Sequence, residues 1–231
     1  MIGESHYSLV LDTRLAPLVA AQDHEGIFQL LGSLSNSQFR TAVYMLGEQF
    51  APSMPLEAFW PLFSAMVKHN AKAFLTVMLK ALAVRMELGR ASVSDEGFAS
   101  LCQVMNDVDR HKTATFLLPL MKDDAEVLLL FRLLGMPHSE ERISYLMKVN
   151  TLPCAFVLFS SLRYVEHDRD FLLRVAYFLM KRGDALSFNL ASLMKEYFGL
   201  EEMKGTFSLR LKPFELARLE TSYRAFCDKM G

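Results

Sequence analysis

The stretch from residue 70 to residue 90 has the spacing of a buried helix, and this spacing constrains the fold more than any other feature. Its apolar residues recur every three or four positions and form one wide stripe: Phe74, Val77, Met78, Ala81 and Leu82. Asn70 is a residue type that caps helix N-termini, and Gly89 is a natural stop. The stretch therefore predicts one helix with a broad apolar face.

Similar stretches recur along the chain. We expect helices over residues 12–21, 25–34, 38–50, 55–69, 70–90, 95–106, from 109 or 110 to Pro119, 123–134, 138–149, 151–165, 168–182, 185–198 and 213–229. Pro61 predicts a kink or a restart of the helix near Trp60, because proline removes a backbone hydrogen bond. Connections of about two to six residues force sequential helices to be antiparallel neighbours. The predicted fold is all-α, a single α-solenoid-like domain over residues 1–231 with about a dozen helices stacked as antiparallel hairpins.

A series of phenylalanines has the spacing of helical-hairpin repeats. Each lies within the first two turns of an expected helix, with intervals of 35, 42, 40 and 32 residues: Phe39, Phe74, Phe116, Phe156 and Phe188. Hairpin repeats have periods of this length. The residues around them agree only loosely, and the tetratricopeptide and ankyrin patterns are not met. We favour repeats, and an irregular helical bundle is the alternative.

Two short segments have the period of a strand instead of a helix. Residues 206–212, TFSLRLK, alternate apolar and polar side chains, and residues 7–11 show a weaker form of the same pattern. A lone strand is unstable, so we expect these segments to form a minor two-stranded element. Pairing within one chain requires a curled stack of hairpins, whereas pairing between chains would make a homodimer. The alternative is two extended loops packed on helices.

The composition is that of a folded protein with no global attraction to polyanions. Apolar residues make up 52% of the chain and charged residues 22%, which favours a folded protein over a disordered one. The formal net charge of −1 means that a nucleic acid or an anionic membrane would need a local basic patch. The longest uncharged runs, residues 26–39 and 149–162, have 14 residues each, short of the roughly 20 that cross a bilayer.

The N-terminus and the cysteines predict a cytoplasmic protein. The first residues have no basic region before an apolar one, and Ile2 stands where N-myristoylation needs glycine. The three cysteines are far apart in apolar helical surroundings: Cys102, Cys154 and Cys227. This arrangement favours reduced core thiols over a disulfide framework or a zinc site.

The dipeptide His167-Asp168 resembles the His-Asp pair of the HD-domain phosphohydrolases, which are all-helical and bind a divalent metal. The resemblance implies a metal site formed by His138, His167, Asp168 and either Asp184 or Asp228. The pair lies in a charged interhelical turn over residues 166–170, and the small residues that follow it in that family are missing here. We favour a capped turn, keep the metal-dependent phosphohydrolase as an alternative, and name no family.

Other polar groupings have simpler interpretations than catalysis. Asp107, Asp109 and His111 could meet one metal ion, but they flank a helix junction where acids commonly cap the next helix. The sequence contains no HExxH pair, Glu-x-x-His pair, glycine-rich phosphate loop or nucleophile elbow. Catalytic groups need only converge in space, so an enzyme stays open. We favour a protein without catalytic activity and expect no cofactor.

Basic residues are densest near the C-terminus, where over residues 204–229 they outnumber the acidic residues by three. They are Lys204, Arg210, Lys212, Arg218, Arg224 and Lys229, against Glu215, Glu220 and Asp228. A second candidate surface joins Tyr164 and Tyr177 to nearby arginines, although neighbouring acids nearly cancel its charge. The binding-surface candidates are therefore Arg210, Lys212, Arg218, Tyr164 and Tyr177.

The leading functional hypothesis is a scaffold or interaction protein. Stacked helical hairpins expose long contiguous surfaces, and helical-repeat folds without catalytic signatures are commonly interaction modules. We expect a protein segment to bind along a groove between hairpins, and we expect no membrane partner. A homodimer through the strand segments or an apolar helix face, and nucleic-acid binding through the C-terminal basic segment, are the further hypotheses.

Overall fold

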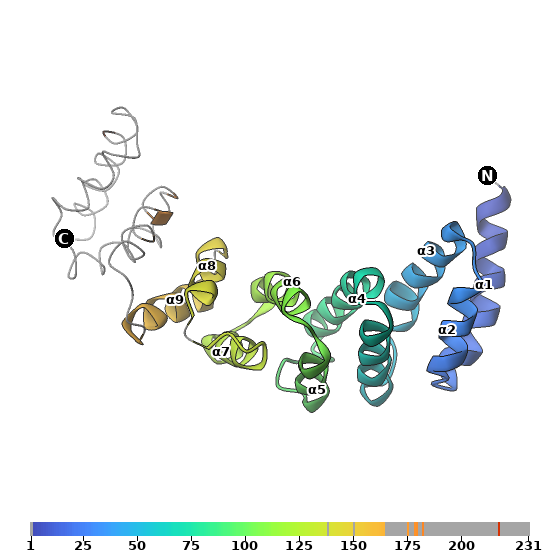
Figure 1. The fold of residues 1–231 in the computed structure, drawn as a ribbon, viewed down its shortest axis with the longest axis horizontal. Helices are drawn as coiled ribbons and strands as arrows, with labels where there is room; N and C mark the ends of the chain where they lie inside the picture. Colours follow the sequence, from blue (N-terminus) through green and yellow to red (C-terminus); the bar gives the residue numbers. More distant parts are fainter. Residues whose placement is uncertain are drawn as a thin grey trace. The chain divides into compact units, whose positions relative to one another are not determined.

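The computed structural model describes residues 2–137, 139–149 and 151–164, together with residues 175, 178, 179, 182 and 217 (Figure 1). The chain divides into two compact units, Met1–Gly135 and Met136–Gly231. Each unit is treated separately below. A single domain over the whole chain stays a prediction.

The described part of the chain is helical and contains no strand. It holds nine α-helices, a π-helical segment η1 and a 3₁₀ turn η2. In order they are α1 (Ile2–Ala20), α2 (His24–Gly32), α3 (Asn36–Met45), η1 (Leu46–Phe50), α4 (Leu56–Glu87), α5 (Glu96–Val104), α6 (Asp107–Leu117), η2 (Leu118–Leu120), α7 (Asp124–Leu133), α8 (Glu140–Lys148) and α9 (Leu152–Tyr164).

The all-α prediction is confirmed for these residues, but the described part holds nine α-helices where about a dozen were expected for the chain. The helices expected over residues 168–182, 185–198 and 213–229 fall largely outside the described residues.

Helices of the first unit pack mainly against their neighbours along the chain. Helix α1 contacts α2 and α3, α3 contacts α4, and α4 contacts α5 and α6. Such local contacts are what hairpins joined by short loops require. None of the helices in the described residues combines the length and apolarity needed to cross a lipid bilayer.

The phenylalanine series does not occupy equivalent environments in the first unit. Phe74 is buried, with 1% of its surface exposed, whereas Phe39 and Phe116 are only half-buried. Phe39 and Phe74 also touch each other, with ring centroids 6.0 Å apart. The side chains of Phe156 and Phe188 lie outside the described residues. The repeat interpretation therefore stays a prediction.

The strand expected over residues 7–11 is wrong, because these residues lie inside α1. Leu11 and Leu15 show why: they are one helical turn apart and are 3% and 0% exposed. Five residues are too few to separate a period of two from the i, i+4 spacing of a helix. Residues 206–212, the other half of the proposed two-stranded element, lie outside the described residues. The segment at residues 7–11 cannot be their partner strand, because it is helical.

Helix α4 consists of two helical segments joined at Asn70 (Figure 1). Asn70 has non-helical torsion angles, φ −162° and ψ 86°, and its side-chain oxygen accepts a hydrogen bond from the backbone N–H of Ala73 at 3.2 Å. The predicted N-cap at Asn70 is thereby confirmed.

The kink expected near Trp60 is wrong, because the only break inside α4 is at Asn70. Pro61 lies on the exposed side of the helix, as does Glu57, whose carbonyl would have accepted the missing N–H. Water can satisfy that carbonyl, so the helix continues through the proline without interruption.

Aromatic side chains of the first half of α4 build the core with α5. Phe59 and Phe63 are fully buried, with ring centroids 5.7 Å apart. Trp60 meets Phe98 of α5 at a centroid distance of 6.0 Å. Gly97 lies directly against the indole, because a Cβ added there would be 2.1 Å from Trp60 Cγ. The close approach of α5 to α4 therefore depends on a position without a side chain.

A buried arginine joins the second half of α4 to the loop that precedes α4. Arg85 is 3% exposed, and its Nη1 donates to the carbonyl oxygens of Ala51, Pro52 and Met54 at 2.9, 3.3 and 2.6 Å. Its guanidinium carbon lies 4.5 Å from the centre of the Phe59 ring. Burial lowers the pKa of Arg85, because it removes the guanidinium from water.

The second unit contains the helix pair α8 and α9, which is also joined by a buried arginine. Arg142 of α8 is 2% exposed, and its Nη2 donates to the Ser161 hydroxyl oxygen at 2.6 Å. Burial lowers the pKa of Arg142. Ser161 in turn donates to the carbonyl of Val157 at 2.7 Å. A polar chain thus crosses an otherwise apolar helix interface.

Replacing Arg85 should weaken the first unit. Arg85→Met removes the donor for three loop carbonyls, so we expect the free energy of unfolding to fall by about 2 kcal/mol. Guanidinium unfolding followed by the fluorescence of Trp60, the one tryptophan of the chain, measures this. Arg14→Met, at an exposed position of α1, is the matched control and should change it by less than about 0.5 kcal/mol. Equal effects of the two changes would contradict the structural role of Arg85.

Phe74→Ala should cost about 3–5 kcal/mol, because it leaves a cavity where a fully enclosed ring packs. The Phe74 ring lies 6.5 Å from that of Phe28 and 6.0 Å from that of Phe39, centroid to centroid. The same unfolding measurement applies. Val84→Ala on the same helix is the control, since Val84 is 42% exposed. A cost near zero for Phe74→Ala would show that this ring is not part of the core.

Candidate binding groove

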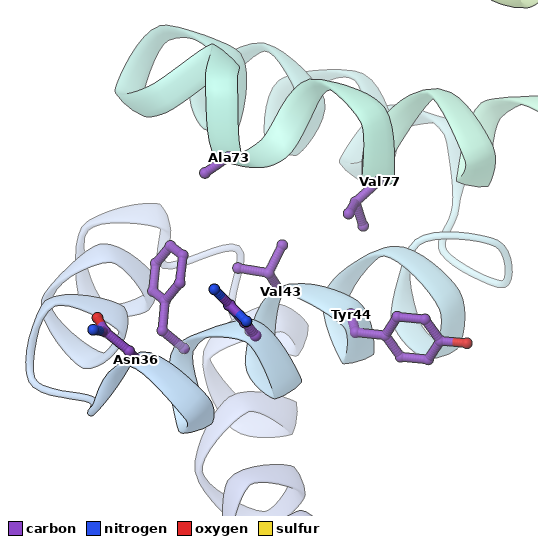
Figure 2. A pocket seen from close by; sticks show the side chains of 7 residues that line it. Asn36, Val43, Tyr44, Ala73 and Val77 are labelled. Atoms are coloured by element: carbon purple, nitrogen blue, oxygen red, sulfur yellow. The ribbon is translucent and has the colours of Figure 1, made fainter.

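A groove lies between α3 and the second half of α4 in the first unit (Figure 2). Its volume is about 490 Å³, and it is open to solvent. The apolar residues that line it are Phe39, Val43, Ala73 and Val77, and the polar residues are Asn36, Arg40 and Tyr44. In Figure 2, Ala73 and Val77 extend from α4 toward α3, with Val43 on the facing side.

Helical periodicity places these side chains together. Asn36, Arg40 and Tyr44 follow one another at intervals of four residues, so they form one edge of α3. Val43 follows Phe39 by the same interval and lies beside that edge. On α4 the lining residues are small, and the space between the helices remains because neither Ala73 nor Val77 fills it.

The start of α3 is fixed by its own capping residues. The side-chain oxygen of Gln38 accepts a hydrogen bond from the backbone N–H of Ser35 at 3.1 Å. Ser35 has the extended torsion angles of an N-cap, φ −65° and ψ 160°. This Ser-x-x-Gln arrangement is a capping box, so Asn36 begins the helix at the mouth of the groove.

The segment η1, which continues α3, touches α4 at Gly47, just beyond the groove. Gly47 is a buried residue of η1, and a Cβ added to it would lie 2.0 Å from Val77 Cγ1 and 3.2 Å from the Val77 carbonyl oxygen. All the α3 residues that line the groove precede this contact. The absence of a side chain at Gly47 therefore sets the spacing of the walls.

The polar edge of the groove carries one positive charge and no carboxylate. Arg40 is exposed and has no hydrogen bond or ion pair with another described residue. Tyr44 is 53% exposed, and its hydrogen bond with the Glu48 side chain raises the pKa of its phenol. The edge thus presents a guanidinium and an amide at one end and an engaged phenol at the other.

The metal-site residues predicted from the sequence fall outside the described part of the chain. They are His138, His167, Asp168 and Asp184, with Asp228 as the alternative ligand. Among the residues that are described, no group of three or more His, Cys, Asp or Glu side chains could hold a metal ion. The phosphohydrolase hypothesis therefore stays a sequence-based prediction.

The junction before α6 is a capped helix start, although the cap differs from the expected one. Asn106, not an acid, accepts the hydrogen bond from the backbone N–H of Asp109 at 3.0 Å. Asp109 is 8% exposed, whereas Asp107 is exposed in the first turn. The His111 ring contacts the carbonyl of Asp107, one turn earlier. The helix start is thus capped, but the acids that were expected to cap it lie inside the first turn instead.

The basic candidates Arg210, Lys212 and Arg218, together with Tyr177, also lie outside the described residues. Tyr164 is the last residue of α9, where only its backbone is described. Neither surface predicted from charge is therefore tested.

The described cysteines are buried thiols, as expected. Burial raises the pKa of Cys102 to about 12 and also raises the pKa of Cys154. A thiol with a raised pKa is protonated at neutral pH and is a poor nucleophile. Cys227 lies outside the described residues.

Comparison with known proteins yields no relative: no family model, curated protein or solved structure matches the chain. The groove therefore rests on its geometry alone. Sequence reasoning did not find its residues, although Gly47 and Ala73 are the type of signal that marks closely spaced helices.

Substituting Gly47 should push the walls of the groove apart. Gly47→Ala places a methyl group against Val77, so we expect a loss of about 1–3 kcal/mol in the free energy of unfolding, measured through Trp60 fluorescence. Gly32→Ala is the matched control, because a Cβ there meets no atom within 4 Å. That change should be neutral or stabilising by up to about 1 kcal/mol. Tolerance of alanine at Gly47 would contradict the tight helix contact.

Proposed function

We propose that this chain is an interaction protein that binds a segment of another protein, and that the groove between α3 and α4 receives the segment. The observation that supports the proposal is the groove itself, with apolar walls on two helices and a polar edge on one of them. Binding sites commonly combine an apolar interior with a few placed polar groups. The volume of about 490 Å³ falls within their usual range of about 300–1,000 Å³.

The form of the groove favours a chain segment over a small enclosed ligand. The groove is open to solvent and is bounded by two helices, so a ligand could enter from the side without being enclosed. Peptide segments use such sites by inserting one or two apolar side chains and leaving their polar groups at the edge. The apolar walls at Val43, Ala73 and Val77 are suited to the inserted side chains.

The other functional hypotheses depend on residues outside the described part. The phosphohydrolase requires His167 and Asp168, and nucleic-acid binding requires the C-terminal basic segment. Dimerisation through residues 7–11 loses its basis, since these residues are helical. A homodimer through an apolar helix face and a cytoplasmic location remain expectations from the sequence.

Site-specific crosslinking in the native cell tests the proposal. A photoreactive benzoylphenylalanine at Tyr44, which is 53% exposed at the groove, should give a discrete crosslinked partner. The same group at Val108, which is 76% exposed on α6, should not give that adduct. Mass spectrometry of the two samples identifies the partner and the crosslinked peptide.

A groove-filling variant completes the test. Ala73→Tyr fills the space between the walls and keeps Trp60 as the single tryptophan, so its fluorescence can verify folding. The adduct at Tyr44 should disappear in the folded Ala73→Tyr protein. No adduct from Tyr44, or the same adducts from Tyr44 and Val108, would reject the groove as a binding site.

A further inference from the structure

We propose that the bound segment is acidic: an Asp or Glu carboxylate pairs with Arg40, and a neighbouring apolar side chain inserts between Val43, Ala73 and Val77. This inference rests on the proposed binding function and specifies the chemistry of its partner. It follows from how charge is distributed along the edge of the groove.

The first step is the unengaged charge of Arg40. Arg40 lines the groove and is exposed, and its guanidinium makes no ion pair or hydrogen bond with another described residue. Arginine presents several donors in a planar fork that matches a carboxylate. An incoming carboxylate would therefore find donors that need not first be released from another partner.

The second step is the composition of α3. The helix has no Asp or Glu over its whole length, Asn36–Met45, so nothing on it repels an anion. Asn36, one turn before Arg40, adds an amide donor at the groove. The N-terminal end of a helix also has a partial positive charge that favours anions. All three features coincide at the same end of the groove.

The third step is the contrast with the opposite end. Tyr44 lies two turns after Asn36, and Glu48 follows Tyr44 by four residues at an exposed position. That carboxylate supplies negative charge where the groove approaches the Gly47 contact. A segment would therefore bind in one direction, with its acid toward Asn36 and its apolar residue over Val43.

The fourth step separates an acidic peptide from a nucleic acid. A phosphate backbone is held by several aligned cations, whereas the lining of this groove contains one. Its apolar walls have no use in binding phosphates but suit a leucine or an aromatic side chain. The arrangement of one cation beside an apolar surface favours a single carboxylate next to an apolar residue.

Selection from a displayed random-peptide library on the full chain tests the inference. Peptides that bind should be enriched in Asp or Glu adjacent to Leu, Ile, Phe or Trp. The best sequence is then synthesised with a fluorescent label, and its affinity is measured by anisotropy. Changing its acid to the matching amide should weaken binding about three- to tenfold, and salt should weaken binding of the acidic form.

Variants of the protein locate the charge. Arg40→Glu should weaken binding about tenfold or more, because repulsion replaces attraction. Arg40→Lys should retain affinity within about threefold, since the charge remains. Lys112→Glu on α6 is the matched charge reversal at an exposed position and should change affinity by less than about twofold.

The outcomes distinguish this inference from the binding function itself. One outcome is that the selected peptides are neutral or basic, that Ala73→Tyr abolishes their binding, and that Arg40→Glu leaves their affinity unchanged. This outcome would overturn the acidic specificity but leave the groove as the binding site. If Ala73→Tyr does not affect any selected peptide, both fall. A random-sequence oligonucleotide is tested as a competitor of the labelled peptide. If it competes, and Arg40→Glu abolishes this competition, the inference of an acidic peptide is overturned in favour of a phosphate backbone.

Discussion

The buried guanidinium of Arg85 holds together the part of the molecule on which the groove depends. Through one nitrogen it donates to three carbonyl oxygens of the loop backbone, those of Ala51, Pro52 and Met54, and so joins the loop to the second half of α4. That loop follows η1, and η1 continues α3, so the arginine fixes both walls of the groove relative to each other. Burial removes the guanidinium from water and thereby lowers its pKa. The loop carbonyls replace water as its hydrogen-bond acceptors, and this holds the loop in one conformation.

The break at Asn70 lets one long helical segment serve two purposes. Before Asn70, α4 packs against α5, and its aromatic residues Phe59, Trp60 and Phe63 are buried in the core. After Asn70, the helix starts again under its own cap and presents Ala73 and Val77 to α3. A straight helix would direct both halves along one line, so the change of direction makes the second contact available.

The helices were predictable because their signals are local, whereas the groove depends on distances between segments far apart in sequence. The cap at Asn70 and the burial of Phe74 follow from side chains within two turns of each other. The effect of Pro61 did not follow, because it depends on whether one carbonyl faces water. The space beside Ala73 depends on Gly47 and Arg85. Neither residue belongs to a sequence motif from which a binding groove could be predicted.

The burial of Cys102 in the first unit and Cys154 in the second has a chemical consequence. Each thiol is buried and is protonated at neutral pH, so an alkylating reagent can reach it only when the structure around it opens. With Cys227 replaced by serine, the alkylation rates of Cys102 and Cys154 can be measured separately in one sample. The two rates would report how often the structure around each cysteine opens. They would also show whether a ligand in the groove slows the alkylation of Cys102 alone.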